Sequence, residues 1–276
     1  MTTTLAPRAD EIAAEMLAAL DARRQVPPIT GRADELDLAE AYRVAAAVRR
    51  RRQARGERVV GRKIGFTNTT IWDEYGVHAP IWGYVYDTTL HDLEGGSGTF
   101  ALSAVVEPRI EPEIAFGLSR TPERGMDERA LLDCVAWVAH GFEIVQSLFP
   151  GWRFAAADTV AAFGLHGALL LGQRLPVPAG ERDRWCAQLG SFGIALALNG
   201  AVVEQGLATN VLGGGPLAAL RHLVEGLAAD PDSAPLEAGE IVTTGTLTKA
   251  LPIAPGQTWS TRIEGLPNAG VVLRLT

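Results

Sequence analysis

The short β-rich runs that follow residue 58 constrain the fold more than any other feature of this sequence. They alternate with turns rich in Gly, Pro and Asp, and few helical segments separate them. A doubly wound nucleotide-binding fold would need a helix between most of its strands. We therefore predict an α+β fold whose mixed, largely antiparallel sheet curls into a β-roll. The expected strands are residues 58–66, 105–116, 167–175, 193–203, 240–248 and 270–276.

Two helical segments precede this β-rich part. Residues 9–24 place apolar side chains at helical intervals, with acids at the start and arginines at the end, as the helix dipole favours. A second helix is expected at residues 36–52. The change in composition predicts an N-terminal helical region at residues 1–57 and a β-roll domain at residues 58–276. Within that domain, helices are expected at residues 127–142 and 215–229.

Charge and composition exclude several classes of partner. The net charge of −7 argues against nucleic acid and anionic membranes, because binding to either relies on Lys and Arg. No apolar run reaches the ~18 residues that span a bilayer, and the start, MTTTLAPRADE, does not resemble a secretory signal. Cys134 and Cys186 stand far apart, which is typical of free thiols in an intracellular protein. We expect a soluble, cytoplasmic protein.

The only basic block is VRRRRQARGER, at residues 48–58. It lies at the end of a predicted helix, and no aromatic residues separate its arginines. These features favour a solvated helix face over a phosphate-binding patch.

The run VVEPRIEPEIAF, residues 105–116, places glutamates in a strand that is otherwise largely apolar. Residues two apart on a strand point to the same side, so Glu111 and Glu113 project together about 6.5–7 Å apart, with Glu107 and Arg109 further back. Two covered carboxylates repel each other, and a divalent cation removes that cost. Oxygen ligands favour Mg²⁺, Mn²⁺ or Ca²⁺. The alternative is a solvated strand face on which Arg109 pairs with one glutamate.

Two further charged residues stand in apolar surroundings. Glu143 is the only acid in WVAHGFEIVQSLF, and a buried acid needs a partner. It is a candidate third metal ligand, with a salt bridge to an arginine such as Arg153 as the alternative. Lys63 lies between two glycines in GRKIG, where it either solvates a surface or supplies positive charge or a proton to a metal-bound oxyanion.

Four motifs together resemble the fumarylacetoacetate hydrolase superfamily: GRKIGFTN, EPEIAF, FEIVQS and TTGTLT, in that order and spacing. They are most similar to its branch of 2-keto-4-pentenoate hydratases and 4-oxalocrotonate decarboxylases. The resemblance covers nearly the whole chain and implies a mixed β-roll with an N-terminal helical part. It further implies a homo-oligomer, with complex formation with a related pathway enzyme as a second expectation.

The resemblance also implies a reaction. It predicts a Mg²⁺-dependent lyase, with Mn²⁺ as a second metal, that hydrates or decarboxylates a 2-hydroxy-2,4-dienoate or 2-oxo-enoate through a metal-stabilised enolate, as in aromatic meta-cleavage catabolism. The sequence matches the family's metal ligands at Glu111, Glu113 and Glu143, and its active-site lysine at Lys63. The substrate-carboxylate loop corresponds to Gly245 and Thr246.

Several positions depart from the family pattern. Ile81 stands where the family has an aspartate in its P-D-[FY]-G stretch, and EIVQSL carries Gln146 and Leu148 where the family has an acid and an arginine. AAFGLH, residues 161–166, replaces a polar segment and introduces His166. His166 or His78 is expected to take over acid–base work, because imidazole changes protonation near neutral pH. A packed or surface histidine is the alternative for each.

Two other functions stay open at this stage. One is a hydrolase that cleaves an acylpyruvate-like C–C bond with water activated by a histidine–glutamate pair. The other is a non-catalytic partner subunit of a related decarboxylase or hydratase, although the retained glutamates and lysine argue against it. For the substrate tail we expect an aromatic-lined pocket, with candidates Phe66, Trp72, Trp82, Phe149 and Trp152.

Overall fold

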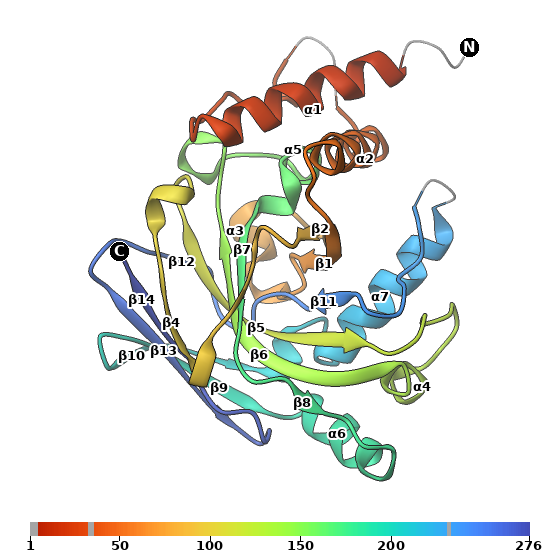
Figure 1. Ribbon diagram of the computed structural model, residues 1–276, viewed down its shortest axis with the longest axis vertical. Helices are drawn as coiled ribbons and strands as arrows, with labels where there is room; N and C mark the ends of the chain where they lie inside the picture. The colour runs from red at the N-terminus through yellow and green to blue at the C-terminus, as the bar shows by residue number, and fades with distance from the viewer. Residues whose placement is uncertain (1–4, 33–35, 231–232) are drawn as a thin grey trace.

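The computed structural model describes residues 5–32, 36–230 and 233–276 of the protein (Figure 1). Its helices are α1 Leu5–Asp21, α2 Leu38–Ala54, α3 Trp72–Tyr75, α4 Glu128–Leu132, α5 Ala156–Ala161, α6 Arg182–Leu189 and α7 Pro216–Ala229. Its strands are β1 Val59–Gly65, β2 Ile81–Tyr86, β3 Leu90–Asp92, β4 Ser97–Phe100, β5 Arg109–Leu118, β6 Val135–Val145, β7 His166–Leu171, β8 Leu175–Pro176, β9 Gly193–Leu198, β10 Ala201–Leu207, β11 Ile241–Thr243, β12 Leu251–Pro252, β13 Thr258–Glu264 and β14 Val272–Leu275.

The strands form two mixed sheets. The larger has the order β2-β1-β11-β5-β6-β7-β3, with β12 paired to β5 and β8 paired to β6, and the smaller has the order β10-β9-β13-β14-β4. β1 with β11, β3 with β7 and β4 with β14 run parallel, and the other pairs are antiparallel. Asn199 and Gly200, both with positive φ, join β9 to β10 as a two-residue hairpin turn. The predicted α+β class with a mixed, curled sheet is confirmed.

The larger sheet curls, so its two faces have different surroundings. On its concave face, Val85 of β2 belongs to the same apolar cluster as Leu169 of β7, although the two strands stand near opposite ends of the strand order. On the convex face, Ile110 packs against the smaller sheet, and Ile114 and Phe116 pack in the cluster that includes α7. The odd-numbered residues of β5 therefore point into the hollow of the curled sheet.

The two N-terminal helices lie over one end of the sheets, next to α5 (Figure 1). The Asp37 side chain caps α2 by accepting a hydrogen bond from the backbone N–H of Glu40. Met16, Leu17 and Val44 are buried in one apolar cluster together with Phe149, Val160 and Phe163 of the later chain. The two predicted N-terminal helices are confirmed, and none of the helices in the described parts of the chain is long and apolar enough to cross a membrane.

The predicted helix at residues 127–142 is largely wrong. Only α4 forms, and the chain then enters β6, which is buried along nearly its whole length. A strand covered on both faces loses its polar–apolar alternation. Without that alternation its sequence cannot be distinguished from that of a buried helix. Glu107 is a second correction, because it lies before β5 with a φ of 45° and is exposed, so it does not share the covered side of the strand. The helix predicted at residues 215–229 is confirmed as α7, with Pro216 in its first turn.

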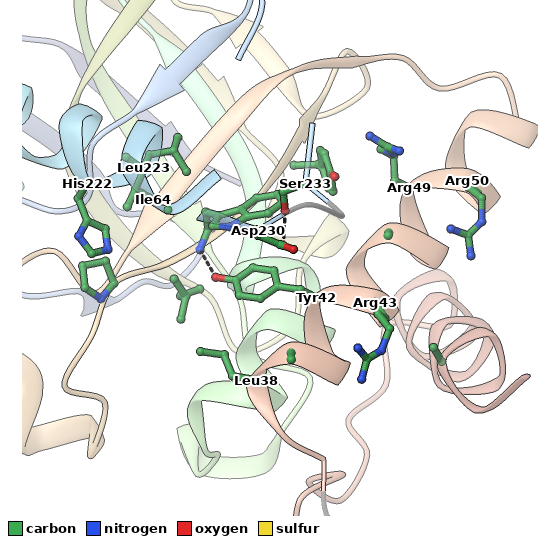
Figure 2. Close-up of a pocket in the computed structure, with 18 residues that line it drawn as sticks. Leu38, Tyr42, Arg43, Arg49, Arg50, Ile64, His222, Leu223, Asp230 and Ser233 are labelled. Carbon is green, nitrogen blue, oxygen red and sulfur yellow. Dashed lines mark hydrogen bonds between the residues drawn. The ribbon is translucent and has the colours of Figure 1, made fainter. Parts of the chain in front are cut away.

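The convex face is open between α2 and α7. There the sheet leaves a cleft of about 800 Å³, floored by residues of β1 and β2 (Figure 2). Lys63 of β1 faces the opposite, concave side, where the predicted site residues gather.

Candidate metal centre

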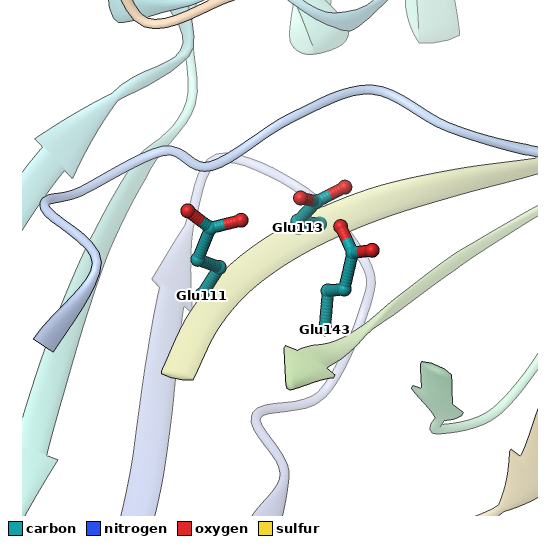
Figure 3. Close-up of side chains that lie close together, drawn as sticks. All are labelled: Glu111, Glu113 and Glu143. Carbon is teal, nitrogen blue, oxygen red and sulfur yellow. The ribbon is translucent and has the colours of Figure 1, made fainter. Parts of the chain in front are cut away.

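Three glutamates converge on the concave face of the curled sheet. β5 and β6 pair antiparallel so that Glu111 lies directly opposite Glu143, and Glu113 follows two residues along β5 on the same face (Figure 3). One carboxylate oxygen from each lies within 4.8 Å of those of the other two. Glu113 is 1% exposed and Glu143 is 0% exposed, while Glu111 is half-buried. The structure thus brings together all three predicted ligands, which we call the glutamate trio.

The loop after β11 contacts the trio through a hydrogen bond to Glu113. Gly245 has a φ of +89°, and a Cβ at this position would lie 1.8 Å from the Thr67 hydroxyl, so no other residue fits there. The backbone N–H of Gly245 donates a 2.9 Å hydrogen bond to Oε2 of Glu113. Thr246 lines the same cavity as Lys63 and Glu111, and its hydroxyl donates to the carbonyl of Thr248. In this structure the Gly245 donor therefore orients a predicted metal ligand.

Lys63 reaches the trio from β1. It is one of only two lysines in the chain and is 2% exposed. Its Nζ donates to the carbonyl of Gly164 at 2.9 Å and lies 3.3 Å from Oε2 of Glu143. Glu143 is thus paired with Lys63, and the alternative pairing with Arg153 is not needed.

His166, at the start of β7, contacts the same glutamate. Its Nδ1 lies 2.7 Å from Oε1 of Glu143, and its Nε2 lies 2.9 Å from the hydroxyl of Thr89. Burial lowers the pKa of His166, while the pairing with Glu143 opposes that shift. His166 thus supports Glu143 from the side away from the other two glutamates. His78, the second candidate, is exposed and packs edge-on against Trp72, outside this cluster.

Burial and charge give the four ionisable groups different protonation behaviour. Burial raises the pKa of Glu111 to about 7, and it raises that of Glu113 well above its usual value, with repulsion from the neighbouring glutamates adding to the shift. Burial alone would also raise the pKa of Glu143, but Lys63 and His166 hold it below its usual value. For Lys63, burial opposes the charged form, yet the three carboxylates raise its pKa. The centre holds more carboxylates than one lysine can neutralise.

The trio fits a divalent cation. Oε1 of Glu113 is buried and has no hydrogen-bond partner among the described residues, and Oε2 of Glu143 has only its ion pair with Lys63. Buried oxygens without a donor are costly unless a cation supplies the missing interaction. The donors are all carboxylate oxygens, which suit Mg²⁺, Mn²⁺ or Ca²⁺ better than Zn²⁺. Glu111, Glu113 and Glu143 would hold the ion.

A narrow cavity adjoins the trio. Its free space of about 20 Å³ holds about one water molecule, so side chains in its wall must move before a substrate enters. Two of the five predicted aromatic residues, Phe66 and Trp152, line it, and Tyr75 joins them. Sequence reasoning missed Tyr75, which lies in a short helix that no motif marks. The other three predicted aromatic residues do not line this cavity: Trp72, Trp82 and Phe149.

The cavity wall also contains unusual backbone. Phe66, Trp152 and Leu165 have φ values of 55°, 58° and 63°, a region that residues with a Cβ rarely adopt. Such conformations persist only where the surrounding structure imposes them, and they gather at ligand sites. Three of the eight non-glycine residues with positive φ in the described parts of the chain thus lie in this one cavity wall.

The other departures from the family pattern have structural roles. Ile81 is buried and pairs with Gly65 of β1, which puts its apolar side chain on the same face of the sheet as Lys63. Gln146 accepts from the backbone of Val106 and donates to the carbonyl of His166. Leu148 packs in the N-terminal apolar cluster. Of the altered positions, only His166 contacts a member of the trio.

The chain is similar to proteins of known activity and to solved structures. No protein-family model matches the chain. The chain is 31% identical over 254 residues to the 2-hydroxyhexa-2,4-dienoate hydratase of Comamonas testosteroni, a match that covers 92% of each protein. The solved structure of 4-oxalocrotonate decarboxylase from Pseudomonas putida G7, complexed with magnesium and adipate, matches with a TM-score of 0.87 and 26% identity over 98% of both chains.

A more distant structure shares the fold alone. It is the fumarylpyruvate hydrolase from Pseudomonas aeruginosa in complex with Mn²⁺ and pyruvate, with a TM-score of 0.57 and 14% identity over 78% of this chain and 88% of that one. Fold and trio define a β-rich protein with a carboxylate site on the concave face of a curled sheet. The chain belongs to the family of 2-keto-4-pentenoate hydratases and 4-oxalocrotonate decarboxylases. The identification from sequence motifs is confirmed.

Proposed function

We propose that this protein is a Mg²⁺-dependent lyase that hydrates or decarboxylates a 2-hydroxy-2,4-dienoate or a related 2-oxo-enoate, and that Mn²⁺ can replace Mg²⁺. The observation that carries the proposal is the trio of Glu111, Glu113 and Glu143, with Lys63 beside it. The hydratase of Comamonas testosteroni and the decarboxylase solved with magnesium and adipate support this choice of reaction and metal.

A bound divalent cation would supply Lewis acidity to the two oxygens of a chelating 2-oxo acid. The trio has three negative charges when fully ionised, so Lys63 offsets the charge that an anionic substrate adds. Its Nζ lies in the cavity wall beside Glu143, where an ammonium group can also hold or deliver a proton. His166 keeps Glu143 oriented through its 2.7 Å contact.

The remaining cavity wall suits the rest of such a substrate. Thr246 lines the cavity together with Glu111. There we place the substrate carboxylate, held by Thr246 and Gly245, while Phe66 and Trp152 provide apolar surface for a short unsaturated tail. The N–H of Gly245 already donates to Glu113, so its part in binding substrate requires that this bond is shared or exchanged.

The hydrolase alternative has one observation in its favour. His166 and Glu143 form a buried histidine–glutamate pair at 2.7 Å, the arrangement that would activate water for cleavage of an acylpyruvate-like substrate. We rank it second because a relative that is 31% identical over 92% of this chain is a hydratase. A non-catalytic partner subunit ranks third, since such a subunit needs neither the trio nor Lys63.

Three organisational proposals accompany this function. The curled sheets form the β-roll, residues 1–57 serve as a helical region, and residues 58–276 form the catalytic domain. The helical region shares an apolar cluster with Phe149 and Phe163 of that domain, which favours joint folding. We also propose a homo-oligomer, with association with a related enzyme as the second assembly. Light scattering of the purified protein tests the homo-oligomer, and co-purification tests the association with a related enzyme.

The first test of the function is calorimetric titration with oxalate, a mimic of the chelating end of a 2-oxo acid, with and without Mg²⁺. We expect oxalate to bind only when Mg²⁺ is present, and the Glu113→Ala variant to lose this binding. Glu107→Ala is the matched control, because this exposed glutamate lies outside the trio. Binding of oxalate without a metal, or no metal binding at all, would remove the basis of the proposed chemistry.

Product analysis separates the alternatives once the metal site is established. Incubation with a 2-hydroxy-2,4-dienoate should yield a hydrated 2-oxo acid, and incubation with a 2-oxo-enedioate should release CO₂ if decarboxylation dominates. Release of two carboxylic acids from an acylpyruvate, with neither lyase reaction, would establish the hydrolase alternative.

Magnesium binding should weaken as the pH falls through about 7. Glu111 and Glu113 must both lose their protons before they can bind a cation, and burial raises the pKa of Glu111 to about 7 and that of Glu113 well above its usual value. Protons therefore compete with the metal throughout this range. Calorimetric Mg²⁺ titrations at about pH 6 and about pH 8 measure the effect. Equal affinities at the two pH values would contradict the assigned ligands.

A further inference from the structure

The cleft between α2 and α7 lies on the convex face of the curled sheet, away from the glutamate trio. β1 separates the two sites, since it places Lys63 in the wall of the narrow cavity and Ile64 in the wall of the cleft. We propose that this cleft, with its volume of about 800 Å³, is a second binding site, for a small planar anion of the aromatic carboxylate class.

The positive charge of the cleft comes from α2. Within the basic block, Arg51 and Arg52 form ion pairs with carboxylates. Arg43 and Arg49, which line the cleft, have buried Nε atoms without a hydrogen-bond partner among the described residues. Neither arginine forms an ion pair with a carboxylate of the described residues, so their guanidinium groups can donate charge-assisted hydrogen bonds to an anion bound in the cleft.

The floor of the cleft is aromatic. Tyr42 stacks on Trp82 with ring centres 4.9 Å apart and an interplanar angle of 21°. Tyr84 lies beside them, with the guanidinium groups of Arg49 and Arg62 at 5.3 and 4.5 Å from its ring centre. Trp82 and Tyr42 are half-buried, so ring surface is available to a planar ligand. Aromatic surface next to arginine side chains suits a flat, negatively charged molecule.

Charge balance and size support the same class of ligand. Among the described residues, the cleft is lined by three arginines, Arg43, Arg49 and Arg50, and by one acid, Asp230 (Figure 2). This local excess of positive charge stands out in a chain whose net charge is −7. The volume lies within the range of about 300–1,000 Å³ that is typical of small-molecule sites. A planar carboxylate satisfies both the arginines and the aromatic floor.

The test is calorimetry with 2-naphthoate as the probe. We expect 2-naphthoate to bind, and its neutral counterpart 2-naphthamide and the non-planar cyclohexanecarboxylate each to bind at least about tenfold more weakly. The Glu113→Gln variant should bind 2-naphthoate as the wild type does, because the probe sits in the cleft. Loss of binding in that variant would place the probe at the metal centre and overturn the proposal.

Variants of the cleft provide the second arm. The double variant Arg43→Gln/Arg49→Gln and the single variant Trp82→Leu should each weaken 2-naphthoate binding at least about tenfold. Arg55→Gln is the matched control on α2, because Arg55 pairs with Asp21. Unchanged binding in the double variant would overturn the proposal, and it decides the matter even if Trp82→Leu does not fold.

Light scattering on the same variants distinguishes a ligand site from a contact between copies of the chain. We expect the molar mass in solution to be the same for the wild type and the double variant. A fall in molar mass caused by Arg43→Gln/Arg49→Gln would assign the cleft to an interface between copies and overturn the small-molecule proposal.

Discussion

The Glu113→Gln variant is expected to lose metal-dependent activity and, at the same time, to make the metal-free protein more stable. Gln cannot supply a charged ligand, so activity should fall by more than the roughly 10–100-fold that follows loss of an outer-shell partner. The stability gain has a different cause. Burial raises the pKa of Glu113 well above its usual value, so the folded metal-free protein is penalised wherever the unfolded chain ionises this group.

The sign of the stability effect depends on pH. The folded state holds the Glu113 proton more tightly than the unfolded state, so the wild type loses stability as the pH rises above about 4.5, the ordinary pKa of a glutamate. The gain from Glu113→Gln should therefore be present at neutral pH and absent near pH 4. Urea unfolding of metal-free protein at both pH values, with Glu107→Gln as the control, measures it. A variant that is less stable than wild type at neutral pH would contradict the buried, repelling trio.

Replacing Lys63 by Met should reduce turnover by about 10²–10⁴-fold, the range typical of losing a general acid or base. Mg²⁺ binding should persist, and should not weaken, because the variant removes a positive charge 3.3 Å from a carboxylate oxygen of the proposed ligand Glu143. The two effects together would assign Lys63 to the reaction and not to holding the metal.

The chain offers a matched control for this variant. Lys249, the second of its two lysines, is exposed, and Lys249→Met should keep wild-type turnover and Mg²⁺ affinity. Turnover and calorimetric Mg²⁺ titration of both variants measure the difference. A Lys63→Met enzyme within about tenfold of wild-type turnover would rule out Lys63 as a proton carrier.

The strand alternation of β5 made its part of the candidate centre predictable from sequence. An E-x-E pair in an apolar strand puts Glu111 and Glu113 on one face whatever the rest of the fold does. The pairing of Glu111 with Glu143 is different, because it depends on the register between β5 and β6, which local patterns do not specify. The family motifs supplied the link that spacing alone could not.

The parts that sequence reasoning missed have physical reasons. Residues 138–142 are buried on both faces of the curled sheet, so their apolar run carries no period-two signal and has the composition of a buried helix. Tyr75 reaches the cavity from a short helix within a loop, and no local pattern marks such a position. Ile81 replaces a family acid on the face of the sheet that carries Lys63, and only the pairing of β1 with β2 shows which side of the sheet it covers.

The alternation of side chains along β5 and β6, which brings the trio together, also limits how the sequence of this protein can evolve. A one-residue insertion within β5 or β6 would turn every later side chain of that strand to the opposite face and carry the ligands out of the hollow. The strands can therefore accept substitutions but not changes in length. Phe66, Tyr75 and Trp152 lie outside these strands, so new substrate preferences have their freest route through the loops around a centre of fixed geometry.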